Sequence, residues 1–418
     1  MQKYFVAALA LVLAGWHGSA HAIDLTANDW TFSVNGNVNV HYIYSSCQSV
    51  DTAATIVTVG GACTGTASGS SVSNIGNGLL PAALVFGVTT TQDGIDIGAH
   101  FGLYPGIATN DGGSPNLQVN EGDSNVGLGT TGLDVRQVYM TFGNKDMGTF
   151  TLGRNFGLFG FDAIINDMTL PGVGVAGSAS TATPSNTTLG SIGFGYIYVD
   201  TLAQMDYTTP SFAGTTVTVG IFDPLDSLTD PGTPAPKKAP GFHGKIAYKT
   251  QFTDDLKFYA SATAIYQKQD YLAAADAPVQ YTSRGGDVFA QLKYLGFEFD
   301  GSYYYGKGMG TTGLFILASD GLGHSRKSDG YLLQGTYTIG PVKFGANYGV
   351  SKLDFASAQD AAAVPNLLQS NNKVTGGVYY SLTKNLTLLT EFSRVWTEAH
   401  NGLENKSINA NAGAYLSF

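Results

Sequence analysis

Residues 30–44 read WTFSVNGNVNVHYIY, and this stretch decides the fold class. Its even positions are apolar, aromatic or glycine, whereas its odd positions are polar from Thr31 to His41, with Ile43 as the exception. Successive side chains of a β-strand point to opposite faces of the sheet. Strict alternation therefore predicts a strand with one face in an apolar medium and the other in water.

The same alternation returns at 95–104 and 342–351. The water-facing positions carry residues such as Asp96, Lys343 and Asn347, which indicates that the inside of the predicted sheet is wet. The sequence contains no helical stripe of comparable length, so the chain is predicted to be all-β.

Short and long connections alternate along the chain, which is the arrangement that antiparallel strands require. Short turns are predicted at 93–94, 145–147, 213–214, 253–255, 296, 340–341 and 383–385. Long loops are predicted near 45–78, 105–131, 156–195, 223–241, 268–285, 308–328, 353–372 and 398–405. They separate sixteen predicted strands at 30–44, 81–92, 95–104, 133–144, 148–155, 196–209, 215–222, 242–252, 256–267, 286–295, 297–307, 329–339, 342–352, 373–382, 386–397 and 406–418.

This pattern predicts a 16-stranded antiparallel transmembrane β-barrel with short periplasmic turns and long outer loops. Closing the sheet leaves no unpaired edge in lipid, so we expect one domain over 23–418. A barrel of sixteen strands is wide enough to leave an aqueous channel.

The leader and the composition agree with an exported membrane protein. Residues 1–22 hold a basic residue, Lys3, then an apolar run and the sequence Ala20-His21-Ala22, which is typical of a secretory signal peptide. Among 418 residues there are 55 Gly, 23 Tyr and 23 Phe, but only 12% are charged. Aromatics are too abundant for a disordered tail, and charges are too few for an ordinary cytoplasmic enzyme. The formal net charge of −10 argues against a nucleic-acid partner.

The end of the chain resembles the closing strand of outer-membrane barrels. Ile408, Ala410, Ala412, Ala414 and Leu416 share one face with the terminal Phe418. A terminal strand that ends in Phe is read by the machinery that inserts such barrels, so this machinery is an expected partner.

A family resemblance is clearest over 136–171. RQVY at 136–139 and GTFTLGRN at 148–155 resemble the fourth and fifth strands of the trimeric general porins of Gram-negative bacteria. FDA at 161–163 and NDMTLP at 166–171 resemble the start of their third loop, which folds into the barrel and narrows the pore. The resemblance implies a homotrimer in the outer membrane, among lipids and lipopolysaccharide. It also implies passive diffusion of small hydrophilic solutes and ions, with no cofactor and no enzymatic chemistry.

The resemblance places a pore constriction around the third loop, with Arg136 on the wall and Asp162 and Asp167 on the loop. The wider set expected there is Arg136, Phe156, Phe159, Phe161, Asp162 and Asp167. In the family, acidic groups commonly follow the Pro of this loop, whereas here residues 172–177 read GVGVAG. We therefore expect a weaker transverse field and a more apolar constriction. The phenylalanines either guide a partly apolar solute or fix the loop to the wall.

Parity and resemblance together assign Arg154 to the trimer contact. It shares a face with Phe150 and Leu152, which should point outward, and an Arg in the middle of the lipid costs about 2–4 kcal/mol. The expected partner is the second loop, where Glu121 is one candidate together with Asp111 and Asp123. The alternative is an Arg at the rim in contact with water or lipid phosphate. By the same parity argument, Arg136 would also point outward unless this wall is buried in a trimer, so the face that Arg136 presents stays open.

Two further pairs of residues are predicted from the loops and the lumen. Cys47 and Cys63 lie in the first long loop of an exported chain, so we expect a disulfide rather than two free thiols. His41 and His100 fall on the wet face, but a zinc site needs three or four ligands, so we expect polar lining and no metal site.

Charge predicts a mild preference for cations. Removal of the leader with Lys3 changes the formal net charge from −10 to −11, and a cleft of one sign concentrates the opposite ion. The opposing charges are lysines with lumen-facing parity: Lys245, Lys249, Lys257, Lys293 and Lys343. The alternatives that stay open are a porin selective for a partly apolar solute, a plugged barrel acting as surface anchor or adhesin, and a barrel enzyme.

Overall fold

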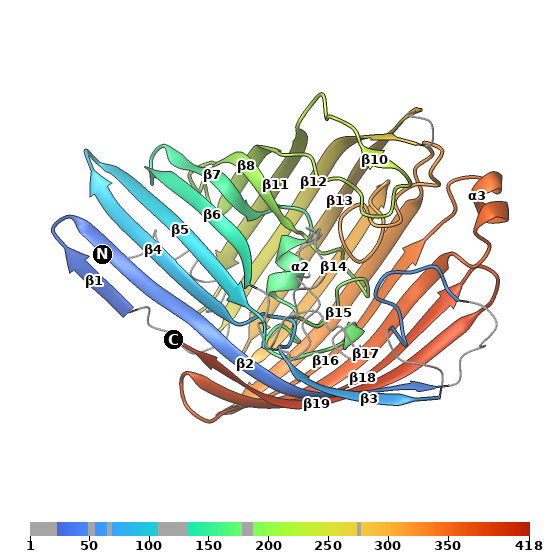
Figure 1. Ribbon diagram of the computed structural model, residues 1–418. Helices are drawn as coiled ribbons and strands as arrows, with labels where there is room; N and C mark the ends of the chain where they lie inside the picture. The colour runs from blue at the N-terminus through green and yellow to red at the C-terminus, as the bar shows by residue number, and fades with distance from the viewer. Residues whose placement is uncertain (1–22, 49–54, 65–68, 108–132, 178–186, 274–276) are drawn as a thin grey trace.

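One antiparallel sheet closes on itself to form a barrel (Figure 1). The computed structural model describes residues 23–48, 55–64, 69–107, 133–177, 187–273 and 277–418. Strand β2 pairs with β19 on one side and with β3 and β4 on the other, which completes the ring. The predicted fold class, a 16-stranded antiparallel barrel, is confirmed. No helix in the described residues is long and apolar enough to cross a bilayer.

The elements are as follows. The first part of the sheet comprises β1 (Ile23–Ala27), β2 (Trp30–Gln48), β3 (Ser71–Gly76), β4 (Ala83–Gln92), β5 (Ile95–Pro105), β6 (Leu133–Asn144), β7 (Gly148–Phe156), β8 (Thr201–Thr208), β9 (Thr215–Phe222) and β10 (Thr233–Pro234). The second part comprises β11 (Gly241–Gln251), β12 (Leu256–Leu272), β13 (Pro278–Tyr294), β14 (Phe297–Lys307), β15 (Lys327–Ile339), β16 (Val342–Leu353), β17 (Leu368–Ser381), β18 (Leu386–Ala399) and β19 (Glu404–Ser417). The helices are α2 (Phe161–Ile165) and α3 (Ala358–Ala363).

The alternation of the sequence corresponds to the two faces of the wall. In β2, Val38 and Tyr42 are 46% and 52% exposed on the outside, whereas Asn39 and His41 are buried inside the barrel. The apolar band therefore faces lipid and the polar set faces the lumen, as expected for an outer-membrane barrel.

Three short strands, β1, β3 and β10, supplement the sixteen that cross the membrane.

Strand β19 pairs with β2 as far as Ser417, opposite Asn37. Strand β1 then continues the wall, with Ile23 opposite Val34. Between them, Gly36 and the terminal Phe418 exchange two backbone hydrogen bonds of 2.9 and 3.1 Å. The two ends of the barrel chain thus share one seam.

Several strand limits differ from the prediction, and β8, β12 and β13 are among them. β12 and β13 continue their pairing to Leu272 and Pro278, beyond the predicted limits at 267 and 286. Both faces of this extension carry polar residues, so the alternation that marks the membrane part is lost while the backbone pairing persists. Strand β8 starts at Thr201 rather than at 196, because residues 196–199 are buried on all sides inside the barrel.

A β-bulge sets the direction of the Arg136 side chain. The register of β5 and β6 passes from Gly102 opposite Gln137 to Leu103 opposite Val135, so Arg136 is the extra residue. A bulge inserts one residue and shifts the parity of everything on one side of it. Val135 is 45% exposed on the outer face, whereas Arg136 and Gln137 are both buried inside. The bulge therefore settles the direction that parity left open, and Arg136 points into the lumen.

Residues 157–177 and 187–200, here called the inner loop, run through the barrel and carry α2 (Figure 1). The loop backbone comes very close to the wall at β16. A Cβ built on Gly349 would lie 1.8 Å from the carbonyl oxygen of Phe194. Only glycine allows this approach at position 349.

A second segment also turns inward. The predicted long loop at 308–328 does connect β14 and β15, but its residues 309–318 fold into the barrel, where Leu314, Phe315 and Ala318 are almost fully buried. They pack in one cluster with Phe159 and Ile197 of the inner loop. The burial reflects an apolar run that would be unfavourable in water.

An ion pair holds the end of this segment at the outer side. Arg326 donates from Nε and Nη2 to Asp360 at 2.8 and 2.6 Å, and both residues are buried. Burial acts to raise the pKa of the Asp360 carboxyl, but the hydrogen bonds from Arg326 and from the backbone of Ala356 outweigh it, so the pKa is lowered. Asp360 therefore stays ionised and fixes α3 to the inward segment.

We expect Gly349→Ala to destabilise the folded barrel by about 1–3 kcal/mol, the usual cost of overpacking. The new methyl group would push the inner loop off the wall. The temperature at which the folded band converts to the unfolded band in gel electrophoresis measures this effect. Gly376→Ala is the matched control, since a Cβ there meets no atom within 4 Å. Equal conversion temperatures for the two variants would contradict the close contact.

Candidate pore and its lining

The start of the inner loop is fixed to β11, β12 and β13. The Asp162 carboxylate accepts hydrogen bonds from Lys245 Nζ at 2.7 Å and from the Tyr259 hydroxyl at 3.0 Å. The backbone N–H of Gly160 donates to Asp287 at 3.0 Å. Asp162 is therefore buried in a structural contact and neutralised by a cation of the wall.

The tip of the loop is fixed by a carboxylate of the opposite wall. Glu391 on β18 accepts from the backbone N–H groups of Val173 and Gly174, both at 2.8 Å, and from the Tyr379 hydroxyl at 2.7 Å. A Cβ on Gly172 would lie 2.1 Å from Glu391, so the glycine run lets the loop reach this carboxylate. The acidic group that the loop lacks after Pro171 is thus supplied by the wall.

Asp167 joins the two arms of the inner loop to each other. It accepts from Thr169 Oγ1 at 2.8 Å, from the Ser191 N–H at 3.0 Å and from the Tyr196 hydroxyl at 2.8 Å. It is only 1% exposed. The structure places it inside the loop rather than on a surface that faces the solute.

These anchors leave an open space on the other side of the barrel. A cavity of about 540 Å³ lies between the inner loop and the wall made by β4 to β9 and β11, and it reaches the end of the barrel where the short turns lie. The residues that line it are Asn35, Asn37, Leu80, Pro81, Ala83, Val85, His100, Tyr104, Arg136, Gln137, Thr151, Asn155, Phe156, Gly157, Leu158, Phe161, Gln204, Asp206, Thr208, Ser211, Gly214, Thr216, Thr218, Lys245, Ala247, Lys249 and Tyr259.

A comparison with models of known protein families identifies the family of this chain. A family model described as Gram-negative porin matches residues 6–400. The chain belongs to the Gram-negative porin family.

Solved structures agree on the fold. The outer membrane channel DcaP of Acinetobacter baumannii is 16% identical, with a TM-score of 0.67 over 94% of this chain and 99% of that one. OprB of Pseudomonas putida is 11% identical, with a TM-score of 0.56 over 93% and 94% of the two chains. OmpF of Salmonella typhi, in complex with daunomycin, is 9% identical, with a TM-score of 0.55 over 95% and 100%. A search of curated protein sequences gave no match. This porin is therefore an outer-membrane β-barrel channel for diffusion.

Within this porin, Arg136 lies in the cavity wall. Its Nε donates to Asp134 at 2.6 Å, and its guanidinium lies 5.4 Å from the centre of the Tyr104 ring. Its Nη2 is buried without a hydrogen-bond partner in the described part of the chain. Arg136 is thus a cation of the lumen with unused donor capacity.

The phenylalanines of the predicted constriction divide into two groups. Phe159 has no exposed surface and packs against Tyr304, with ring centres 6.4 Å apart, so it fixes the loop to the wall. Phe156 and Phe161 lie 5.7 Å apart and line the cavity. Fixing the loop to the wall is therefore the role of Phe159, whereas guidance of a solute by Phe156 and Phe161 stays a prediction.

Sequence reasoning missed residues 77–82, which leave the wall between β3 and β4 and enter the lumen. Leu79 is buried against the inner loop, where its N–H donates to the Gly172 carbonyl at 2.7 Å. Asn39 of β2 accepts from the Gly78 N–H at 2.8 Å and donates to the Leu80 carbonyl at 3.0 Å. Leu80 and Pro81 then border the cavity. The apolar pair next to a proline, inside a polar loop, was the available signal.

Arg154 lies on the outer face of β7. It sits opposite Val138 of β6 and Ala203 of β8, both of which point outward, and its Nη2 donates to Thr201 Oγ1 at 3.2 Å. Glu121, its predicted partner, lies outside the described residues. The trimer role of Arg154 and Glu121 stays a prediction.

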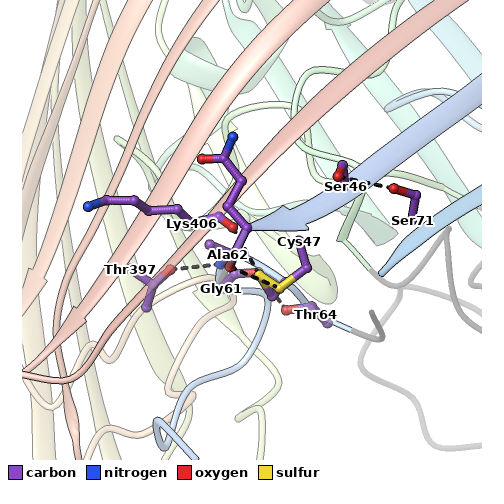
Figure 2. The surroundings of a disulfide bond; sticks show 10 residues. Ser46, Cys47, Gly61, Ala62, Thr64, Ser71, Thr397 and Lys406 are labelled. Atoms are coloured by element: carbon purple, nitrogen blue, oxygen red, sulfur yellow. Dashed lines mark hydrogen bonds between the residues drawn. A yellow bond between two sulfur atoms is a disulfide. The ribbon is translucent and has the colours of Figure 1, made fainter. Parts of the chain in front are cut away.

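The two cysteines form a disulfide at the outer end of β2. Cys47 and Cys63 have Cα atoms 5.0 Å apart. Figure 2 shows the bond beside Ala62, whose N–H donates to Thr397 of β18 at 2.7 Å. The described part of the first loop is thereby fixed to its own strand and to β18, two strands further along the wall.

The histidines of the lumen are lining residues of different kinds. His41 is fully buried under the inner loop, and His100 stacks on Tyr139 with ring centres 4.7 Å apart. In the described residues, no three His, Cys, Asp or Glu side chains come together in a way that could hold a metal ion.

We expect Glu391→Gln to loosen the tip of the inner loop. The amide offers one acceptor oxygen where the carboxylate offers two, so a buried hydrogen-bonding group would be left without its partner. The expected loss in folding free energy is about 1–3 kcal/mol. Single-channel recording should then show more frequent current fluctuations than the native porin. Glu404→Gln is the control, because Glu404 pairs with Lys406 at the outer rim, away from the loop. A noise level equal to that of the control would rule out Glu391 as the anchor of the tip.

Proposed function

We propose that this porin is a general diffusion channel in which small hydrophilic solutes and ions cross between the inner loop and the wall of β4 to β9 and β11. The observation that carries the proposal is the one-sided attachment of the loop. The anchors Asp287, Gln334, Ser351 and Glu391 lie on β13 to β18, away from the cavity. Lys245 and Tyr259, which hold Asp162, lie at the edge of the cavity. The polar side chains in its lining, such as Gln137, Asn155 and Thr216, suit hydrated solutes. We also propose that residues 1–22 are removed as a signal peptide and that 23–418 form the mature barrel.

For ions, we propose a mild preference for cations that is set by the acidic chain as a whole. Asp162 is paired with Lys245, and Asp167 is enclosed by the loop, so neither offers a free charge to the pore. The cavity itself carries Arg136, Lys245 and Lys249 against Asp206, which opposes the net charge. The preference should therefore be weak, and the pore field is further screened over about 10 Å at 0.1 M salt.

Recording in planar bilayers tests both statements. We expect open, weakly voltage-dependent channels and a reversal potential of small cation-preferring sign under a KCl gradient. Asp167→Asn should leave the reversal potential unchanged, because the residue does not face the solute. A silent bilayer would instead indicate a plugged barrel that serves as an anchor. An anion-preferring sign would contradict the ion preference alone.

We further propose a homotrimer that associates through the wall of β2, β4 to β7 and β19. The outward positions Ala410, Ala412 and Ala414 of β19 form a face of small residues, which permits close approach of two membrane surfaces. Arg154 lies on the same wall, with the loop that contains Glu121 as its expected partner on the neighbouring subunit. Lipids, lipopolysaccharide and, through Phe418, the insertion machinery are the other proposed partners.

Arg154→Ala should lower the temperature at which the trimer dissociates into monomers, with conductance per channel unchanged. Mass measurement after gentle detergent extraction gives the oligomeric state, and heating in detergent gives its stability. Three current steps per insertion event are expected for the native porin. Monomers alone would contradict the trimer, whereas an unchanged dissociation temperature would assign Arg154 to the rim.

A further inference from the structure

We propose that the cavity beside the inner loop is a binding site for a small organic anion with an apolar, flat body, such as an aryl carboxylate. The proposal rests on the diffusion channel proposed above, because the site lies on that path. It names a class of solute that the channel retains in passing. The observations that carry it are a basic side and an apolar side that face the same space.

The basic side has unused capacity for an anion. Lys249 of β11 is exposed in the cavity and makes no ion pair within the described chain. Arg136 uses its Nε on Asp134, while its Nη2, in a side chain that is 5% exposed, has no partner there. Lys245 is already paired with Asp162. Of the described residues that line the cavity, Asp206 is the one acid, whereas Arg136 and Lys245 are compensated by Asp134 and Asp162 just outside the lining. Lys249 is therefore the cation that a carboxylate would pair with, and the Nη2 of Arg136 is the further donor.

The apolar side is made by the end of β7, by the first residues of the inner loop and by residues 77–82. Phe156, Phe161, Leu158, Leu80 and Pro81 all line the same cavity. Phe156 and Phe161 pack on a buried cluster that contains Leu79, so their free faces are held toward the cavity. Aromatic faces of this kind favour flat apolar groups through stacking and loss of water.

The two sides together select against simpler ions. An inorganic anion would use the lysine but leave the phenylalanines in contact with water. An organic cation of the same shape would meet Lys249 and Arg136 with like charge. The cavity volume of about 540 Å³ lies within the range of about 300–1,000 Å³ found for small-molecule sites, so a small aryl carboxylate fits with water. The acidic outer surface does not cancel this local field, since charges more than about 10 Å away are screened at 0.1 M salt.

The test is block of the KCl current through the reconstituted full-length porin by three probes of known chemistry. Benzoate carries the charge and the flat body, acetate carries the charge alone, and benzylammonium carries the body with the opposite charge. We expect half-block by benzoate at a concentration at least several-fold below that of either other probe. Because block is measured on open channels, failure of the site is distinguishable from failure of the channel, which would give no current.

Two charge-matched variants locate the site. Lys249→Gln should raise the half-block concentration of benzoate about two- to five-fold, the range of one exposed ion pair. Lys257→Gln removes the same charge from β12 outside the cavity lining and should leave benzoate block unchanged. Equal potency of benzoate and acetate, equal potency of benzoate and benzylammonium, or equal shifts in the two variants would each overturn the proposal. The comparison of probes on the native porin holds even if a variant fails to fold.

Discussion

A backbone that runs through the inside of a barrel is shielded from bulk water, so its N–H and C=O groups need partners from the protein. In this porin the wall supplies them: Glu391 bonds the tip of the inner loop, Ser351 its returning arm and Gln334 its middle. All three side chains lie on β15 to β18. The loop therefore lies against that wall, and the space that remains open is on the opposite side. The position of the candidate pore follows from where hydrogen-bond partners for the loop were available.

The sequence was sufficient to predict the barrel because lipid and water impose different demands on alternate residues. Where the two faces of a strand no longer meet different media, the alternation of apolar and polar residues disappears. β12 and β13 continue pairing beyond the alternating part, since backbone pairing does not depend on which solvent a side chain meets. Residues 196–199 look like a strand because they are apolar, yet they are surrounded by protein and belong to the inner loop. Alternation thus locates a strand between two media, but it cannot distinguish an apolar strand from a buried loop.

The candidate site was harder to predict, because its geometry depends on single-residue shifts and on long-range contacts. One bulge turns Arg136 into the lumen, and no local sequence pattern predicts this bulge. Asp162 and Asp167 were correctly expected on the loop that enters the barrel, but Asp162 pairs with Lys245 of β11, and Asp167 bonds Tyr196 on the returning arm of the same loop. The inward turn of 309–318 could have been predicted from the sequence, since an apolar run of five residues at 314–318 is unusual for a loop in water.

The shared seam at the ends of the chain has a consequence for assembly. The pairing that closes the ring joins Asn37 to Ser417, and Ile23 completes the same edge beside Phe418. Contacts between residues so far apart in sequence carry the largest loop-closure entropy and form slowly. Until they form, β2 and β19 present two open edges whose backbone groups must be paired by water or by another protein. The barrel is therefore sealed only when Ser417 and Phe418 have paired with Asn37 and Gly36, so closure of this seam depends on both distant segments being in place.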